Sequence, residues 1–335
     1  MSTQRLPHSD ILIAGAGIIG LSLALELHAR GAQVTVLERD TALAQASTAA
    51  AGMLAANDPH NPPELLALAE FSLQLYPGFL AQVQTLSGIT VPFQTDTTVQ
   101  YLPDGSHTRF AEYSLDPRQL APALLAAVHA TSIQLEEHDG ELEVADTPEA
   151  IYVRDSTGFE FSAPFLVHAT GAWFRGHNVI RPRKGQMLRV QLPSSLDLRE
   201  VHRSEHIYIA PRTHGPNAGT ALIGATVEDV GFDTTTHPAA LAGLRALAAQ
   251  LLPALSDAAQ IEAWAGLRPA TRDGLPLLGP LPFSPREIAA TGHFRNGILL
   301  APATAHLLAD LLEGKPATLD LTPFSPERFE RSATS

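Results

Sequence analysis

Two arginines lie in loops rich in glycine and proline in the last third of the chain, and their chemistry suits the binding of a small anion. Arg268 ends an apolar stretch that contains Trp264, and Arg295 lies in the sequence GHFRNG. A buried guanidinium keeps its charge and can donate two parallel hydrogen bonds to a carboxylate. We therefore expect Arg268 and Arg295 to bind a carboxylate, with an exposed position at a strand end as the alternative.

Tyr208 is a third residue that can bind the same anion. It alternates with apolar residues between His206 and Ala210, so these three side chains share one face of a predicted strand. A phenol on that face can donate a hydrogen bond to a carboxylate. A tyrosine that only fills the core is the alternative.

A glycine motif near the start of the chain has the spacing of a dinucleotide-binding turn. Gly15, Gly17 and Gly20 lie between a predicted strand and a predicted helix, and Glu38 ends the next strand. The glycines allow a tight turn, close approach of a pyrophosphate, and close packing of helix on strand. The helix N-terminus favours phosphates, and Glu38 suits the ribose hydroxyls. This pattern fits FAD and NAD equally.

Two further segments suit contact with a flat ligand. Residues 47–53, with the sequence STAAAGM, have little side-chain bulk, which suits close packing against a ring system. Residues 292–302 place a glycine-containing loop at the start of the last long helix, whose dipole favours negative charge on a bound ligand. An alanine-rich helix start and an ordinary helix cap are the respective alternatives.

The periodicity of apolar residues indicates which elements position these groups. The strands are expected at residues 10–14, 34–38, 165–167, 186–192, 206–210, 220–225, 261–267 and 287–291, with further short strands around Asp139 and Gly140. Helices are expected at residues 18–30, 63–76, 117–130, 238–252 and 296–313, and the second of these is predicted to stop at Pro77 and Gly78. The alternation in the first forty residues predicts a βαβ unit, hence an α/β fold.

Composition excludes several classes of protein and partner. The 335 residues suffice for two subdomains, and the formal charge of −13 disfavours nucleic acid and anionic membranes as partners. The sequence has no cysteine, so disulfides and cysteine-linked cofactors are excluded. The 14 histidines show no metal-ligand spacing, and we expect no metal site. With neither a signal peptide nor a membrane span predicted, we expect a cytoplasmic protein.

Four sequence blocks together resemble the glycine oxidase group of flavoprotein oxidases, which belongs to the D-amino-acid oxidase superfamily. They are GAGIIG, ASTAAAGMLAA, GLRPATRDGLPLLGP and GHFRNGILLAPATAHLLADLL, and the likeness spans nearly the whole chain. The resemblance implies a Rossmann-like, glutathione-reductase-like FAD domain and a second α+β substrate domain built on a mixed sheet. The FAD domain would comprise residues 1–82, 111–181 and 263–330, and the substrate domain residues 83–110 and 182–262.

The resemblance also assigns residues to the two ligands. Noncovalent FAD would contact the glycine turn, the small-residue segment and the late loop, namely Gly15, Gly17, Ile18, Ile19, Gly20, Glu38, Arg39, Ser47, Ala51, Gly52, Met53, His293, Phe294, Arg295, Asn296, Gly297, Ile298 and Leu299. Arg268 would hold the substrate carboxylate with help from Tyr208 and Arg295, while His206 and Met53 would line the cavity. Cavity size near Met53 and Val227 would set the substrate range.

The implied activity is oxidation of glycine, using dioxygen, to an imine that yields glyoxylate and ammonia, with hydrogen peroxide as the second product. The group supplies the imine for the thiazole of thiamine. Alternatives are a D-amino-acid or N-methylglycine oxidase, a dehydrogenase of the same fold, and a flavin-binding protein without turnover. Between Tyr101 and Asp116 the chain is shorter than is usual in the group. The cavity rim, any lid and homo-oligomeric assembly are therefore left open.

Overall fold

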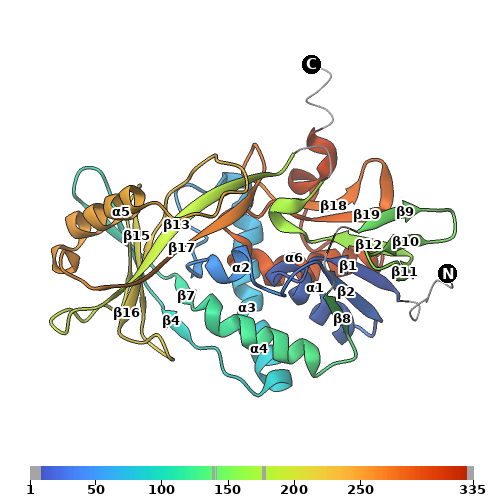
Figure 1. The fold of residues 1–335 in the computed structure, drawn as a ribbon, viewed down its shortest axis with the longest axis horizontal. Helices are drawn as coiled ribbons and strands as arrows, with labels where there is room; N and C mark the ends of the chain where they lie inside the picture. Colours follow the sequence, from blue (N-terminus) through green and yellow to red (C-terminus); the bar gives the residue numbers. More distant parts are fainter. Residues whose placement is uncertain (1–8, 138–139, 141, 176–178, 330–335) are drawn as a thin grey trace.

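A six-stranded, mainly parallel sheet forms the first half of the fold in the computed structural model, which describes residues 9–137, 140, 142–175 and 179–329 (Figure 1). Its strand order is β18-β19-β12-β1-β2-β8, and only β18 runs antiparallel to its neighbour. The bounds are β1 Ile11–Ala14, β2 Val34–Glu38, β8 Gln134–Glu137, β12 Phe165–His168, β18 Leu277–Leu281 and β19 Ser284–Thr291. All four residues of β1 are buried, as a central parallel strand requires.

Helices and a small sheet cover the two faces of this sheet. The helices on one face are α1 (Ile18–Ala29), α3 (Leu66–Ser87), α4 (Pro117–His129) and α6 (Gly297–Leu312), which share one apolar core with the sheet. A three-stranded sheet of β9 (Glu143–Asp146), β10 (Ile151–Arg154) and β11 (Glu160–Ala163) packs on the opposite face. Arg30, at the C-terminal end of α1, links this helix to α6 through an ion pair of 2.6 Å with Asp310.

A seven-stranded mixed sheet forms the other half, on the left in Figure 1. Its order is β17-β13-β16-β15-β14-β5-β6, and α5 (Pro238–Leu251) packs against it. The strands are β5 Thr98–Tyr101, β6 His107–Phe110, β13 Arg181–Gln191, β14 Val201–Arg203, β15 Tyr208–Arg212, β16 Thr220–Gly224 and β17 Gln260–Ala270. The long strands β13 and β17 reach towards the first sheet (Figure 1), and α2 (Ala46–Ala49) contacts both β17 and α4.

Short elements complete the chain. A third sheet has the order β3-β7-β4, with β3 Met53–Leu54, β4 Phe93–Thr95 and β7 Tyr113–Leu115. The 3-10 helices are η1 Pro63–Leu65, η2 Gly171–Trp173, η3 Pro253–Leu255, η4 Thr322–Phe324 and η5 Pro326–Phe329. The short segment after Tyr101 forms the β5-β6 hairpin and leads into β7. None of the helices among the described residues combines the length and the hydropathy that a membrane span requires.

The predicted α/β architecture with a second mixed sheet is confirmed, and β2 occupies the predicted residues. The predicted stop at Pro77 is wrong, because α3 continues to Ser87 and ends at Gly88 in the left-handed conformation. Ser72 and Tyr76 anchor this helix by donating hydrogen bonds to carbonyls of α6, at 2.6 and 2.5 Å. These tertiary contacts thus outweigh the loss of the helical hydrogen bond that proline cannot donate. Strand β18 was not predicted, and Asp139 lies outside the described residues.

Candidate active site

A cavity of about 380 Å³ is lined by residues of both main sheets. Eighteen of the predicted ligand-contacting residues line it, namely Gly15, Gly17, Ile18, Ile19, Glu38, Arg39, Ser47, Ala51, Gly52, Met53, Tyr208, Arg268, His293, Phe294, Arg295, Asn296, Gly297 and Ile298. Three predicted residues, Gly20, Leu299 and His206, do not line it. The cavity therefore joins the glycine turn and the arginines in a single space.

Two of the three glycines of the turn, Gly15 and Gly17, line the cavity, and Gly20 does not. Gly15 has a φ of 107°, and a side chain there would collide with the carbonyl of Ala169. A side chain at Gly20 would collide with the backbone oxygen of Gly15 instead. Gly20 thus allows α1 to pack closely against the turn, which is the packing role predicted for it, and it does not line the cavity.

The start of α1 presents groups that suit a pyrophosphate and a ribose. The first amides of an α-helix have no acceptors within the helix, and the helix dipole places partial positive charge there. The hydroxyl of Ser47 accepts a hydrogen bond from the Ile18 amide at 2.9 Å, and Glu38 accepts one from Ala16 at 2.7 Å. Beside Glu38, the guanidinium of Arg39 lies over the Trp173 ring, 4.7 Å from its centroid.

The small-residue segment is held from the second sheet. The indole of Trp264 donates to the carbonyl of Ala49 at 3.1 Å, and Arg212 donates to the carbonyl of Ala51 at 2.8 Å. The Arg212 side chain is 1% exposed and lies 3.6 Å from Asp116; burial lowers its pKa. Gly52 has a φ of 81°, and a side chain there would collide with backbone and proline atoms. The segment's backbone is thereby fixed along one wall of the cavity.

Arg268 and Tyr208 come together against two glycines on the neighbouring strands. A side chain at Gly185 of β13 would lie less than 3.0 Å from the guanidinium of Arg268, and one at Gly224 of β16 would meet the Tyr208 hydroxyl at 2.5 Å. Burial lowers the pKa of Arg268 and raises that of Tyr208, while each group partly offsets the shift of the other. Arg268 also donates to the carbonyl of Thr226 at 3.1 Å.

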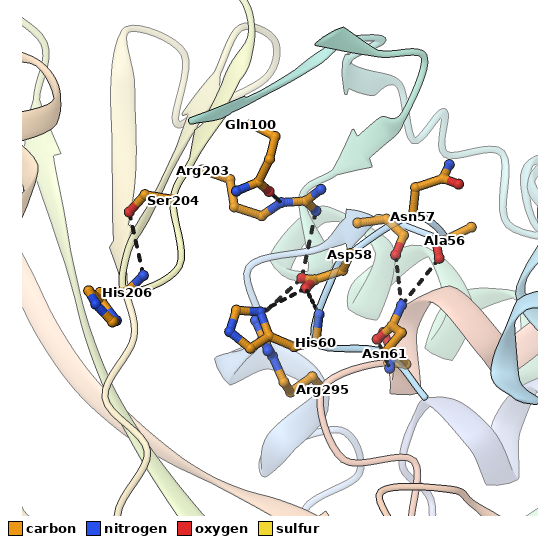
Figure 2. Close-up of polar contacts among 12 residues, drawn as sticks. Ala56, Asn57, Asp58, His60, Asn61, Gln100, Arg203, Ser204, His206 and Arg295 are labelled. Carbon is orange, nitrogen blue, oxygen red and sulfur yellow. Dashed lines mark hydrogen bonds and ion pairs between the residues drawn. The ribbon is translucent and has the colours of Figure 1, made fainter. Parts of the chain in front are cut away.

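Arg295 lines the same cavity but has an acidic partner. Its Nη2 atom lies 3.3 Å from Oδ2 of Asp58, which also lines the cavity. Figure 2 shows Asp58 between Arg295 and Arg203. Burial alone would raise the pKa of Asp58, but Arg295 and Arg203 outweigh it, so the pKa lies below the usual value. Asp58 is therefore an anion next to the predicted carboxylate site.

The loop before α6 has the strained backbone expected at a functional site. Phe294 has a φ of 47°, in the left-handed region, and its amide donates to Pro269 at 2.8 Å. The buried His293 ring lies 3.0 Å from the Thr304 hydroxyl, and burial lowers its pKa to about 3, so it is neutral at neutral pH. Leu299 lies deeper, where its carbonyl accepts from Ser72, which explains its absence from the cavity wall.

The prediction that His206 lines the cavity is wrong. Its side chain is 68% exposed and its amide donates to Ser204 in the turn before β15 (Figure 2). The strand begins only at Tyr208, so the alternation that placed His206 beside it does not extend that far. Val227 is half exposed and does not line the cavity, whereas Met53 does.

Several residues at this site were not predicted from the sequence. Asp58 and Arg203 lie outside the recognised motifs, Arg212 was given no role, and the roles of Gly185 and Gly224 depend on pairing between distant strands. The only available signal was a glycine inside a predicted strand, which often marks a close approach of other atoms. Gly224 fits that rule within the predicted strand 220–225, whereas Gly185 lies just before the predicted strand 186–192.

The geometry defines a class of protein, namely a dinucleotide-binding oxidoreductase. Its cofactor site shares one cavity with arginines that can bind an anionic substrate. The chain matches the family model described as FAD dependent oxidoreductase over residues 10–114 and 108–311. FAD fits the residues present, because glycine backbone, first-turn amides, Glu38 and a wall without bulky side chains line one continuous cavity.

Individual relatives narrow the family. Glycine oxidases from Geobacillus kaustophilus and Pseudomonas aeruginosa are 30% and 32% identical, covering 95% and 94% of this chain and 97% and 98% of theirs. The bifunctional protein ThiO/ThiG of Trichormus variabilis is 35% identical over 97% of this chain, which spans only 56% of that protein's length. The chain belongs to the glycine oxidase branch of the FAD-dependent oxidoreductases.

Solved structures agree with this assignment. The crystal structure of glycine oxidase from Geobacillus kaustophilus superimposes with a TM-score of 0.87 at 28% identity, covering 96% of this chain and 98% of that one. The iminodiacetate oxidase of Chelativorans sp. shares the fold, with a TM-score of 0.82 at 22% identity over 94% of this chain and 98% of that one.

Proposed function

We propose that this protein catalyses the FAD-dependent oxidation of glycine to an imine that yields glyoxylate and ammonia, with hydrogen peroxide as the second product. One observation carries the proposal: the half-buried Arg268, with Tyr208 beside it, lines the same cavity as the cofactor cradle. No ion pair between Arg268 and an acidic side chain occurs in the part of the chain that the structure describes, so its charge is available to a carboxylate.

Arg268 supplies the attraction and the orientation. Its guanidinium packs against Gly185 and donates a hydrogen bond to the carbonyl of Thr226, and both contacts restrict its position. A fixed fork of donors binds a carboxylate with a defined direction for the rest of the molecule. Holding the α-carbon in one orientation towards the cofactor supplies a large part of the rate acceleration in reactions of two bound partners.

Tyr208 contributes a neutral hydrogen-bond donor. Because burial raises the pKa of its phenol, the hydroxyl keeps its proton at neutral pH and can donate to the same carboxylate. His293 is neutral and close to Thr304, so it adds no charge that would compete with Arg268 for the substrate. FAD, when bound, accepts a hydride from the substrate and passes the electrons to dioxygen.

The substrate range and the biological role belong to the same proposal. Sarcosine and small D-amino acids are the alternative substrates, and Met53 lines the cavity that an added methyl group would have to enter. Similarity to ThiO/ThiG proteins supports a role in making the thiazole of thiamine. We also propose a cytoplasmic location and homo-oligomeric assembly, which cell fractionation and light scattering would test.

A substrate panel tests the function directly. Purified holoprotein is mixed with glycine, sarcosine or D-alanine, and hydrogen peroxide is measured against a sample without substrate. We expect glycine to give peroxide and, in the absence of air, to bleach the yellow flavin absorbance. Bleaching without peroxide would indicate a dehydrogenase, and neither signal with any of the three would refute an oxidase.

A further inference from the structure

Four charged side chains form a cluster at the cavity wall, to which Arg295 and Asp58 contribute directly. Figure 2 shows Arg295, Asp58 and Arg203 of this cluster. Arg295 comes from the loop before α6, Asp58 follows β3, Arg203 ends β14 and Glu112 precedes β7. Asp58 lies 3.3 Å from Arg295 and 3.6 Å from Arg203, and Arg203 lies 3.4 Å from Glu112. Segments from both main sheets thus meet in one ion-pair network.

The inner part of this network is inaccessible to solvent. The side chains of Arg203 and Glu112 are 2% and 1% exposed, and that of Asp58 is 7% exposed. Gln100 accepts a hydrogen bond of 2.6 Å from Nε of Arg203, and the backbone amide of Asn57 donates to the Glu112 carboxylate at 3.1 Å. A buried ion loses its hydration, so such groups persist only when they are paired. Arg203 thus lies between Asp58 and Glu112, and these buried ion pairs join Asp58 to the second sheet.

Asp58 presents both oxygens to fixed partners. Its Oδ1 accepts from the amide of His60 at 2.9 Å and lies 3.0 Å from the His60 ring, and its Oδ2 faces the two arginines. The carboxylate therefore cannot turn away from Arg295. The four side chains carry two positive and two negative charges, so the cluster is formally neutral where it borders the cavity.

Arg268 contrasts with Arg295 in this respect. Its contacts are the carbonyl of Thr226 and the phenol of Tyr208, both uncharged, whereas Arg295 lies against a carboxylate. The two guanidiniums are close enough that Arg295 contributes to lowering the pKa of Arg268. The substrate end of the cavity, which we define by Met53, Tyr208, Arg268 and Arg295, therefore offers one free positive charge.

We propose that Asp58 is a positioning and specificity-determining residue that holds Arg295 at the substrate end and cancels its charge, so that the cavity selects amino acids with a single anionic group. The proposal rests on the proposed function and names its substrate class more closely. A second anionic group on the substrate would face Arg295 together with the carboxylate of Asp58, and like charges in a desolvated site repel strongly.

The test compares glycine with iminodiacetate, which is glycine carrying a second carboxymethyl group on its nitrogen. In Asp58→Asn the amide keeps the shape of the side chain but no longer neutralises Arg295. We expect the ratio of kcat/KM for iminodiacetate to kcat/KM for glycine to rise about tenfold, equivalent to about 1.4 kcal/mol of discrimination. Arg295→Gln leaves the cluster with one net negative charge from Asp58. We expect this variant to lower the same ratio, because the negative charge repels the second carboxylate of iminodiacetate.

A double variant and a matched control separate charge from disruption. In Asp58→Asn combined with Arg295→Gln both charges are removed, and the ratio should return to within about threefold of the parent value. Asp40→Asn removes the same kind of charge from a residue that also lines the cavity, next to Glu38, and should leave the ratio unchanged. Flavin absorbance per protein and the thermal midpoint report whether each variant is folded and loaded.

The outcomes distinguish this proposal from the function on which it rests. If Asp58→Asn oxidises glycine and leaves the ratio unchanged, the role of Asp58 is refuted and the function stands. If Asp58→Asn does not fold, Arg295→Gln decides, because an unchanged or raised ratio in that variant contradicts charge cancellation. If the parent protein oxidises no amino acid, the function itself fails.

Discussion

Gly185→Ala is the most direct test of how the strands of the second sheet place Arg268. A methyl group at this position would lie less than 3.0 Å from the Nη1, Nη2 and Cζ atoms of Arg268, whereas ordinary contacts begin at 3.4 Å. The atoms that collide are the far end of a flexible side chain, so the guanidinium can move while the backbone stays in place. Gly185 does not adopt a left-handed φ, and alanine fits its backbone conformation.

The magnitude follows from the displacement. The guanidinium has to move by about 1 Å, and misplacing a catalytic group by that distance costs on the order of 100-fold in rate, or about 2.7 kcal/mol. Complete loss of the interaction, as in Arg268→Ala, would cost roughly 2 to 5 kcal/mol. We therefore expect kcat/KM for glycine to fall about 100-fold in Gly185→Ala, mainly through KM, with FAD still bound.

Initial rates of peroxide formation at varied glycine concentration measure this loss, and flavin absorbance checks the cofactor. Gly243→Ala is the matched control, because Gly243 is an exposed residue of α5 with nothing within 4 Å of the added methyl group. Adding Gly185→Ala to Arg268→Ala should cause no further loss, since the group it displaces is already absent. Normal glycine kinetics in Gly185→Ala would refute the placement of Arg268 in the substrate site.

Three further predictions concern other parts of the site. Glu38→Ala should weaken FAD retention during dialysis by tenfold or more, because a hydrogen bond to a charged group contributes about 1.5 to 3 kcal/mol, and it should not change substrate preference. Gly224→Ala should displace the Tyr208 hydroxyl and lower kcat/KM for glycine by roughly tenfold; a fall in FAD content instead would contradict this reading. The pKa of Asp58 is depressed on folding, so its ionisation stabilises the fold above the unfolded value of about 4, and this contribution is lost as pH falls through the folded pKa. Urea unfolding should therefore show a difference between the parent and Asp58→Asn at neutral pH that shrinks in acid.

Local sequence patterns predicted the parallel strands β1, β2, β12 and β19 of the first sheet, missed β18, and failed where tertiary contacts decide. The βαβ unit at the N-terminus follows from short-range periodicity, and β1, α1 and β2 lie where that pattern places them. Pro77 is a strong local stop signal, yet α3 continues because Ser72 and Tyr76 bind carbonyls of a helix more than 200 residues away. No pattern within the segment contains that information.

The site shows the same limit at the level of side chains. Arg268 and Tyr208 line the cavity as predicted, because each is a polar side chain in an otherwise apolar strand. Gly185 and Gly224 acquire their meaning only from register, since Arg268 pairs with its neighbour strand at Arg183 and Tyr208 pairs with Gly224. The extrapolation of alternation to His206 failed because the strand begins two residues later. Local patterns cannot predict the roles of the two glycines, because the paired residues lie about 16 to 85 positions apart along the chain.

The two ends of the cavity are built by different means, and they should respond differently to substitution. The cofactor end relies on backbone: a φ that only glycine tolerates at Gly15, close packing at Gly20, and first-turn amides of α1. Most changes of side chain there leave those backbone groups in place unless they add bulk. The substrate end relies on long side chains held against glycines or carboxylates of other elements. Replacing a support such as Gly185 displaces Arg268 while the glycine turn and the start of α1 stay in place, so we expect substrate binding to change while FAD binding is kept.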